Sequence, residues 1–101
     1  MRTKPCYTDY VRHIICFYSR HLGKTHFNNN VDKANWYACH YTIEPFPERD
    51  KDILLYVYGA ADTIADNVYV MANKYSLNQN SIWYMMRKFE LKVAIERGLW
   101  V

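Results

Sequence analysis

The sequence predicts an all-α protein of about five helices in one domain. Half of the 101 residues are hydrophobic, and only three glycines and three prolines interrupt them. The apolar residues recur mainly at spacings of three and four, which is typical of helices with one buried face. A chain of this length can bury a core without a metal or crosslinks. We expect residues 45–101 to form a three-helix unit with a helix-turn-helix, covered by a two-helix layer from residues 1–44.

The N-terminal layer is predicted from two helical patterns. Thr8 is suited to cap the first helix, and Gly23 stands where a left-handed residue often ends one. The apolar face of this helix would be Val11, Ile14, Ile15, Tyr18 and Leu22. Asn30 would cap the second helix. Its buried face is expected at Val31, Ala34, Ala38 and Thr42, flanked by Trp36 and Ile43.

A third helix is predicted after the segment EPFPERD. Pro45 cannot continue a helix interior, whereas Pro47 suits a first helical turn, where its missing N–H is no loss. Gly59 would end the helix. Its buried face is expected at Ile53, Leu54, Val57 and Tyr58.

The last two helices have the spacing of a helix-turn-helix. Thr63 and Asp66 form a relaxed capping-box pattern at the start of the first, and Asn78 caps the second, which runs to about Arg97 before Gly98. Ala72 is small enough for a close crossing of the two backbones. The apolar residues expected inside the angle are Met71, Tyr75, Leu77, Ile82 and Met85, and the second helix continues this face through Met86, Phe89 and Val93.

A polar patch begins the last helix and is our candidate DNA-reading face. In a helix-turn-helix this end of the second helix enters the DNA major groove. Asn and Gln amides can bond adenine edges, Arg can bond guanine, and Ser, Tyr and Lys can contact bases or phosphates. The candidate DNA-binding residues are Asn78, Gln79, Asn80, Ser81, Tyr84, Arg87 and Lys88.

Residues Phe46 to Arg97 resemble the fourth, promoter-reading region of primary sigma factors, as in small regulators of phages and mobile elements of Firmicutes. The resemblance lies in FPERDKDILLYVYG, followed by DTIADNVYVMANKYSLNQNSIWYMMRKFELKVA. It implies a DNA-binding transcriptional regulator with Asn78, Gln79, Asn80 and Arg87 in recognition positions. Ser76 replaces the usual turn glycine and NQN replaces an Arg-rich helix start. No other sigma region is present, which is inconsistent with a complete sigma factor.

An aromatic surface on the N-terminal layer supports an alternative function. The chain has ten Tyr and three Trp, and exposed Tyr and Trp favour protein interfaces. The alternative is a small inhibitor or adaptor, for example an anti-defence protein of a mobile element. Its candidate interface is Tyr10, Phe17, Trp36, Tyr37 and Tyr41, with Tyr7 and Tyr18 nearby.

Composition also limits the partners and the chemistry. The net charge of +3 permits nucleic-acid binding, and residues 78–98 carry four basic and two acidic side chains, so double-stranded DNA is the expected partner. Such a module would need a second copy, as a homodimer, or a bacterial protein such as RNA polymerase; in the alternative, the partner is a defence enzyme. Three cysteines without paired spacing favour a reducing cytoplasm. No enzymatic motif is present, and we expect no cofactor, no bound metal and no membrane contact.

Overall fold

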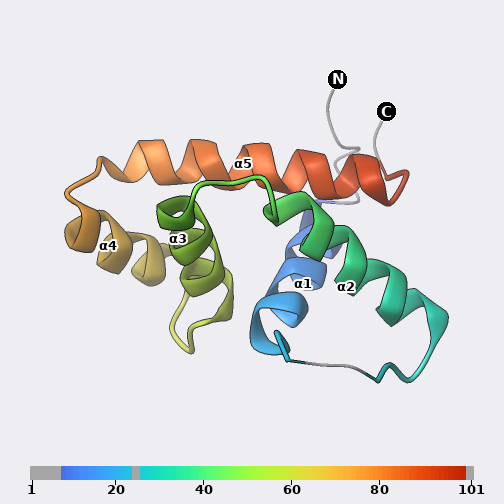
Figure 1. The fold of residues 1–101 in the computed structure, drawn as a ribbon. Helices are drawn as coiled ribbons and strands as arrows, with labels where there is room; N and C mark the ends of the chain where they lie inside the picture. The colour runs from blue at the N-terminus through green and yellow to red at the C-terminus, as the bar shows by residue number, and fades with distance from the viewer. Residues whose placement is uncertain (1–7, 24–25, 100–101) are drawn as a thin grey trace.

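The computed structural model describes residues 8–23 and 26–99, and within them the predicted all-α fold is confirmed. The helices are α1 (Thr8–Arg20), α2 (Asn30–Ile43), α3 (Glu48–Gly59), α4 (Ile64–Tyr75) and α5 (Gln79–Glu96). The longest helix, α5, runs along one side of the molecule (Figure 1). α3 and α4 lie against its N-terminal half, and α1 and α2 lie against its C-terminal half.

One hydrophobic core joins all five helices. Its fully buried members include Ile15 of α1, Cys39 of α2, Leu54 of α3, Val68 of α4 and Met86 of α5. α1 packs against α2, α3 and α5, so it lies in the middle of the assembly. The orientation of α5 is therefore fixed by contacts along its whole length.

The predicted buried face of α1 is confirmed for Val11, Ile14, Ile15 and Tyr18, but not for Leu22. α1 ends at Arg20, so Leu22 follows the helix and is 47% exposed. Gly23 does not adopt the expected left-handed conformation; in the described residues, positive φ occurs only at Ser76 and Gly98. No glycine-dependent cap therefore ends this helix.

The predicted N-cap of α2 is displaced by one residue, and its predicted buried face is confirmed only in part, at Ala38 and Thr42. Asn29, not Asn30, is the N-cap, and its side chain accepts a hydrogen bond from the Asp32 backbone N–H at 2.8 Å. Val31 is exposed and Ala34 only half-buried, so they do not belong to the core face. The buried residues of α2 are Asn35, Trp36, Ala38, Cys39, Thr42 and Ile43.

α3 and α4 follow the sequence prediction closely. The expected face of α3 is buried, and the helix includes Gly59 as its last residue. Pro47 is the N-cap of α3, one residue before the first turn in which we expected it. Thr63 caps α4 by accepting a hydrogen bond from the Asp66 N–H at 3.2 Å, as predicted.

Among the described residues, we find no helix that combines the length and apolar character needed to cross a membrane.

Candidate nucleic-acid interface

The turn between α4 and α5 is held by backbone hydrogen bonds around a left-handed residue. Ser76 has φ 54° and ψ 45°. The Leu77 N–H donates to the Ala72 carbonyl at 2.9 Å, which closes the end of α4. Ser76 thus takes the conformation that a glycine would adopt more easily, and the turn stays tight.

Apolar side chains fill the angle between α4 and α5. Met71, Ala72 and Ile82 are buried, with Ile82 fully inaccessible. Tyr75, Leu77 and Met85 are half-buried and pack against the same core, as does Trp83. The apolar residues expected inside this angle are therefore buried or half-buried.

Asn78 begins α5 as its N-cap. Its side-chain oxygen accepts a hydrogen bond from the Asn80 backbone N–H at 2.8 Å. This oxygen is already occupied, so Asn78 is less suited than its neighbours to a two-bond contact with a base. Among the candidate residues, Gln79 and Asn80 carry the amides that make no hydrogen bond within the described chain.

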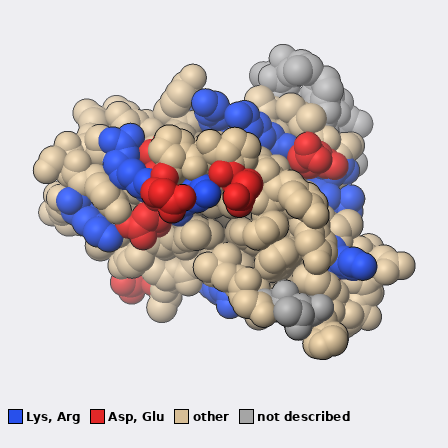
Figure 2. Space-filling view, viewed as in Figure 1, with Lys and Arg blue, Asp and Glu red and all other residues tan. Residues whose placement is uncertain are grey.

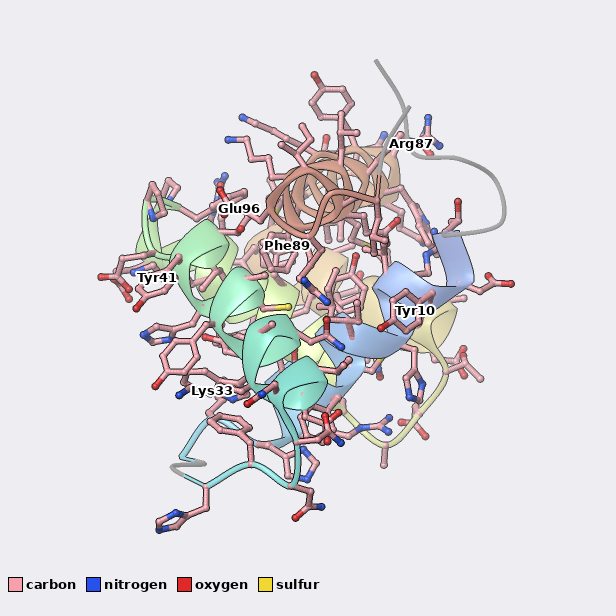
Figure 3. The ribbon with its side chains drawn as sticks, turned by 90° about the vertical axis from the view of Figure 1, so that its right-hand side faces the viewer. Tyr10, Lys33, Tyr41, Arg87, Phe89 and Glu96 are labelled. Carbon is pink, nitrogen blue, oxygen red and sulfur yellow. The ribbon has the colours of Figure 1, made fainter. Side chains whose placement is uncertain are left out.

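The candidate reading face is entirely exposed. Its seven residues are Asn78, Gln79, Asn80, Ser81, Tyr84, Arg87 and Lys88. Tyr84 is the most accessible large hydrophobic residue among the described residues, at 73% exposed. Viewed from the end of the molecule, Arg87 points away from the interior while Phe89, two residues later, points into it (Figure 3).

The charge on this face is positive. Within the described chain, Arg87 and Lys88 lie in no ion pair, and the first turn of α5 contains no acidic residue. Glu90 follows on the helix, but it is buried and bonded to Arg12 and Tyr58. Figure 2 shows basic side chains along α5, whereas acidic and basic side chains are intermixed over α3.

A side-chain link fixes α4 against α3. The Asp52 carboxylate accepts hydrogen bonds from the Tyr75 hydroxyl and, at 2.9 Å, from Lys74 Nζ. The bonds from Tyr75 and Lys74 hold the pKa of Asp52 below its usual value, and they raise the pKa values of both partners. Sequence reasoning missed this link, because Lys74 and Tyr75 lie 22 and 23 residues beyond Asp52 in the chain.

The aromatic surface of α2 is smaller than expected. Trp36 is 7% exposed, and its indole N–H donates to the His21 carbonyl at 2.9 Å, so Trp36 is not a surface residue. Tyr18 is also buried, Phe17 is half-buried, and Tyr7 lies outside the described residues. Tyr37 and Tyr41 remain exposed and stack with ring centroids 5.7 Å apart, while Tyr10 lies separately on α1.

The two cysteines of the described chain, Cys16 and Cys39, are held mainly as protonated thiols. Burial raises the pKa of the Cys39 thiol to about 12 and raises that of Cys16 as well. Both are free thiols, and Cys6 is not among the described residues.

We found no protein family, curated protein or solved structure that matches the chain.

Proposed function

We propose that this protein is a DNA-binding transcriptional regulator that inserts the N-terminal half of α5 into the major groove. The observation that carries the proposal is the exposed polar face of α5, with Gln79, Asn80 and Arg87 free to contact bases. Amides and a guanidinium are the groups that read base edges in the major groove. α4 would then cross the phosphate backbone, as the first helix of such motifs does.

The charge distribution supports modest affinity for a single copy. Two cations without carboxylate partners, Arg87 and Lys88, are few compared with the phosphate contacts of strong DNA binders. The first turn of α5 adds backbone N–H groups at its positive end. A second copy of the chain, or a polymerase partner, would supply the remaining interface.

Replacing Arg87 and Lys88 together tests the electrostatic part of the proposal. The variant Arg87→Ala/Lys88→Ala should bind all DNA more weakly, because two phosphate or base contacts are lost. A plot of log K against log salt should become less steep by about 2, since each lost phosphate contact contributes about 0.9 to the steepness. Fluorescence anisotropy with duplex DNA at several salt concentrations measures both quantities.

The matched control removes two exposed cations elsewhere, Arg20 on α1 and Lys33 on α2. Arg20→Ala/Lys33→Ala has the same net charge as the test variant but an intact reading face. Equal losses in the two variants would mean that only net charge matters, and the reading face would be wrongly placed.

Asn80→Ala tests sequence reading rather than affinity. The Asn80 backbone N–H still satisfies the Asn78 cap in this variant, so α5 should keep its start. Preference at one base position should fall by about 1 to 3 kcal/mol, while affinity for unrelated DNA stays unchanged. Selection from random duplexes, with both proteins in parallel, measures this preference.

A protein-binding inhibitor or adaptor is the second candidate, and the exposed Tyr37–Tyr41 stack favours it. The two rings are 36% and 65% exposed, and aromatic anchors of this kind often dominate protein interfaces. If this candidate is right, Tyr37→Ala/Tyr41→Ala should abolish binding to the protein partner, whereas Arg87→Ala/Lys88→Ala should leave that binding intact. A pull-down that analyses both nucleic acid and protein separates the two candidates.

A further inference from the structure

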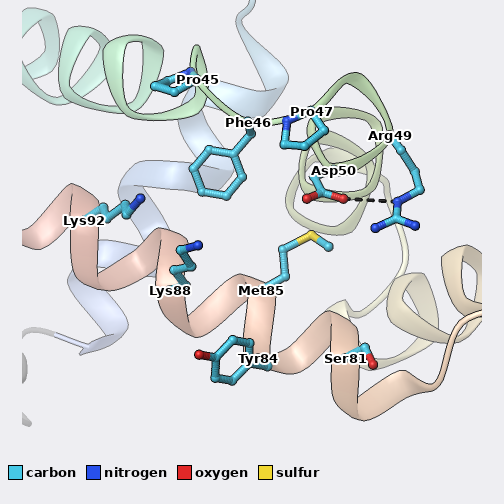
Figure 4. A pocket seen from close by; sticks show the side chains of 10 residues that line it. All are labelled: Pro45, Phe46, Pro47, Arg49, Asp50, Ser81, Tyr84, Met85, Lys88 and Lys92. Atoms are coloured by element: carbon cyan, nitrogen blue, oxygen red, sulfur yellow. Dashed lines mark hydrogen bonds and ion pairs between the residues drawn. The ribbon is translucent and has the colours of Figure 1, made fainter.

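A groove lies between α5 and the segment that links α2 to α3. It has a volume of about 370 Å³, within the usual range of small-molecule sites. Pro45, Phe46 and Pro47 of the link form one wall, and the opposite wall comes from α5 (Figure 4). A second hollow of about 240 Å³ continues past Pro45 and Lys92 toward Tyr41.

The apolar lining of the groove includes an aromatic ring. The Phe46 ring packs edge-on against the buried Phe89 ring, with centroids 5.7 Å apart, which fixes its orientation. Met85 projects from α5 toward Pro47 and Asp50, and its thioether can adapt to a flat ligand. A planar ring is the shape that such a wall accommodates best.

The charged groups of the groove are mostly cationic. Lys88 and Lys92 project from α5 toward Phe46, and Lys92 Nζ lies 5.4 Å from the centre of the Phe46 ring. Asp50 is the acidic member of the lining, and its carboxylate is bonded by Arg49 at 3.2 Å. Neither lysine has a carboxylate partner among the described residues, so both can bind an anion.

We propose that this groove binds a small aromatic anion, its ring on Phe46 and Met85 and its carboxylate, sulfonate or phosphate on Lys88 and Lys92. The site combines a preformed apolar wall with two convergent cations, which is the chemistry such a ligand requires. Ser81, Tyr84 and Lys88 belong both to this groove and to the reading face. The ligand therefore competes with DNA, a consequence that rests on the proposed function.

Matched probes test the charge preference. The anions are indole-3-acetate and naphthalene-1-sulfonate; tryptamine is an aromatic cation, and acetate is an anion without a ring. The protein carries ¹³C-labelled methionine methyl groups, because Met85 lines the groove while Met71 is buried elsewhere. We expect a saturable shift of the Met85 methyl signal with at least one aromatic anion. Tryptamine, which lacks the negative charge, should bind at least about threefold more weakly, the size of one exposed charge contact. Acetate, which lacks the ring, should also bind more weakly, because it cannot contact the apolar lining at Phe46 and Met85.

Variants locate the site. Lys92→Ala should weaken binding of the aromatic anion about threefold, because one exposed charge contact is lost. Lys33→Ala, which removes an exposed lysine from another part of the surface, should leave binding unchanged. Phe46→Leu keeps apolar volume next to Phe89 but removes the ring, and it should also weaken binding. The Met71 methyl signal reports whether each variant is folded.

Any one of three results would overturn the proposal. These are binding of tryptamine as tight as that of both aromatic anions, saturation without movement of the Met85 signal, or no saturable binding by either aromatic anion. DNA binding is measured separately. A protein that binds no DNA but shifts at Met85 refutes the proposed function and keeps the ligand site. A protein that binds DNA but neither aromatic anion keeps the proposed function and refutes the ligand site.

Discussion

Ser76 shows how a single residue sets the geometry of the candidate reading head. Its left-handed backbone lets the Leu77 N–H reach the Ala72 carbonyl, so that α5 starts within a few residues of the end of α4. A residue with a Cβ adopts this conformation at a cost of about 1 to 2 kcal/mol. The cost is offset by the buried side chains that the turn brings together.

Ser76→Gly should therefore stabilise the protein by about 1 kcal/mol, since glycine relieves the left-handed strain but loses more conformational entropy on folding. For a domain of this size, the melting temperature should increase by about 4 to 8 °C. Thermal unfolding followed by circular dichroism measures the change.

Asn73→Gly is the matched control, because Asn73 is an exposed residue of α4 with ordinary helical geometry. It should destabilise the protein by up to about 1 kcal/mol. A loss of stability in Ser76→Gly would show that the serine side chain, rather than the backbone, decides this turn.

Asn67 is a residue whose role could not be predicted from the sequence. It is fully buried in α4, and its amide nitrogen donates to the Val57 carbonyl at 3.0 Å and the Asp62 carbonyl at 3.3 Å. These bonds satisfy carbonyls at the end of α3 and in the loop that follows it. A polar residue within a helical pattern indicates an exposed position, and only the path of the loop makes this one internal.

At the scale of helices, the crossing of α1 and α3 depends on Gly59. A Cβ at this position would lie 3.1 Å from the Ser19 Cβ and 3.3 Å from the Ser19 carbonyl oxygen. Gly59 has no positive φ, so close approach, not backbone conformation, favours glycine there.

Gly59→Ala should destabilise the protein by about 1 kcal/mol. Overpacking costs about 1 to 3 kcal/mol, and the better helix propensity of alanine offsets about 1 kcal/mol of this. Gly23→Ala is the control, because nothing lies within 4 Å of a Cβ there. Urea unfolding of both variants gives the two free energies; a stable Gly59→Ala would mean that α1 has room to move.

α2 shows why its buried face was displaced in the prediction. The predicted buried face was the helical stripe that begins at Val31. In the fold, Asn35 is buried instead, because its oxygen accepts a hydrogen bond from Arg97 at 2.7 Å and its nitrogen donates to the Tyr10 hydroxyl at 3.4 Å. These partners are 62 and 25 residues away in the chain, so the sequence around α2 gives no indication of them.

The link between α3 and α4 should make stability depend on pH. Because the folded pKa of Asp52 is lowered, its ionised form stabilises the fold above the unfolded value of 3.8, and this contribution is lost as the pH falls through the folded pKa. Asp52→Asn should therefore be less stable than the natural protein at pH 6. The difference should shrink as the pH decreases below 3.8.

Urea unfolding at a series of pH values measures this difference. Asp62→Asn is the matched control, since Asp62 is an exposed carboxylate of the loop before α4 and lies outside any ion pair of the described chain. If Asp52→Asn follows the same pH profile as the natural protein, the link to Tyr75 and Lys74 contributes nothing to stability.

For the molecule as a whole, the five helices and most core faces could be predicted because each depends on local spacing. The polar contacts that orient the helices could not, because they join distant residues. Glu90 is the clearest example. Its carboxylate accepts hydrogen bonds from the Tyr58 hydroxyl at 2.6 Å and from Arg12 Nε at 2.9 Å, which connects α5 to α3 and α1. Burial, and then the charge of Glu90, raise the pKa of Tyr58, so its hydroxyl remains a donor.

Glu90→Ala should destabilise the protein by about 1 to 3 kcal/mol, because the fully buried Tyr58 hydroxyl loses its partner. Glu90→Leu/Tyr58→Phe should recover part of this loss, since an apolar pair leaves no buried donor unsatisfied. Urea unfolding of Glu90→Leu, Tyr58→Phe and the double variant gives the coupling energy. If the losses of stability in the two single variants add up to the loss in the double variant, the Tyr58 hydroxyl finds another partner when Glu90 is replaced. A coupled pair would mean that α5 is held in place by this contact, and Glu90→Leu alone should then also weaken DNA binding without removing any group from the reading face.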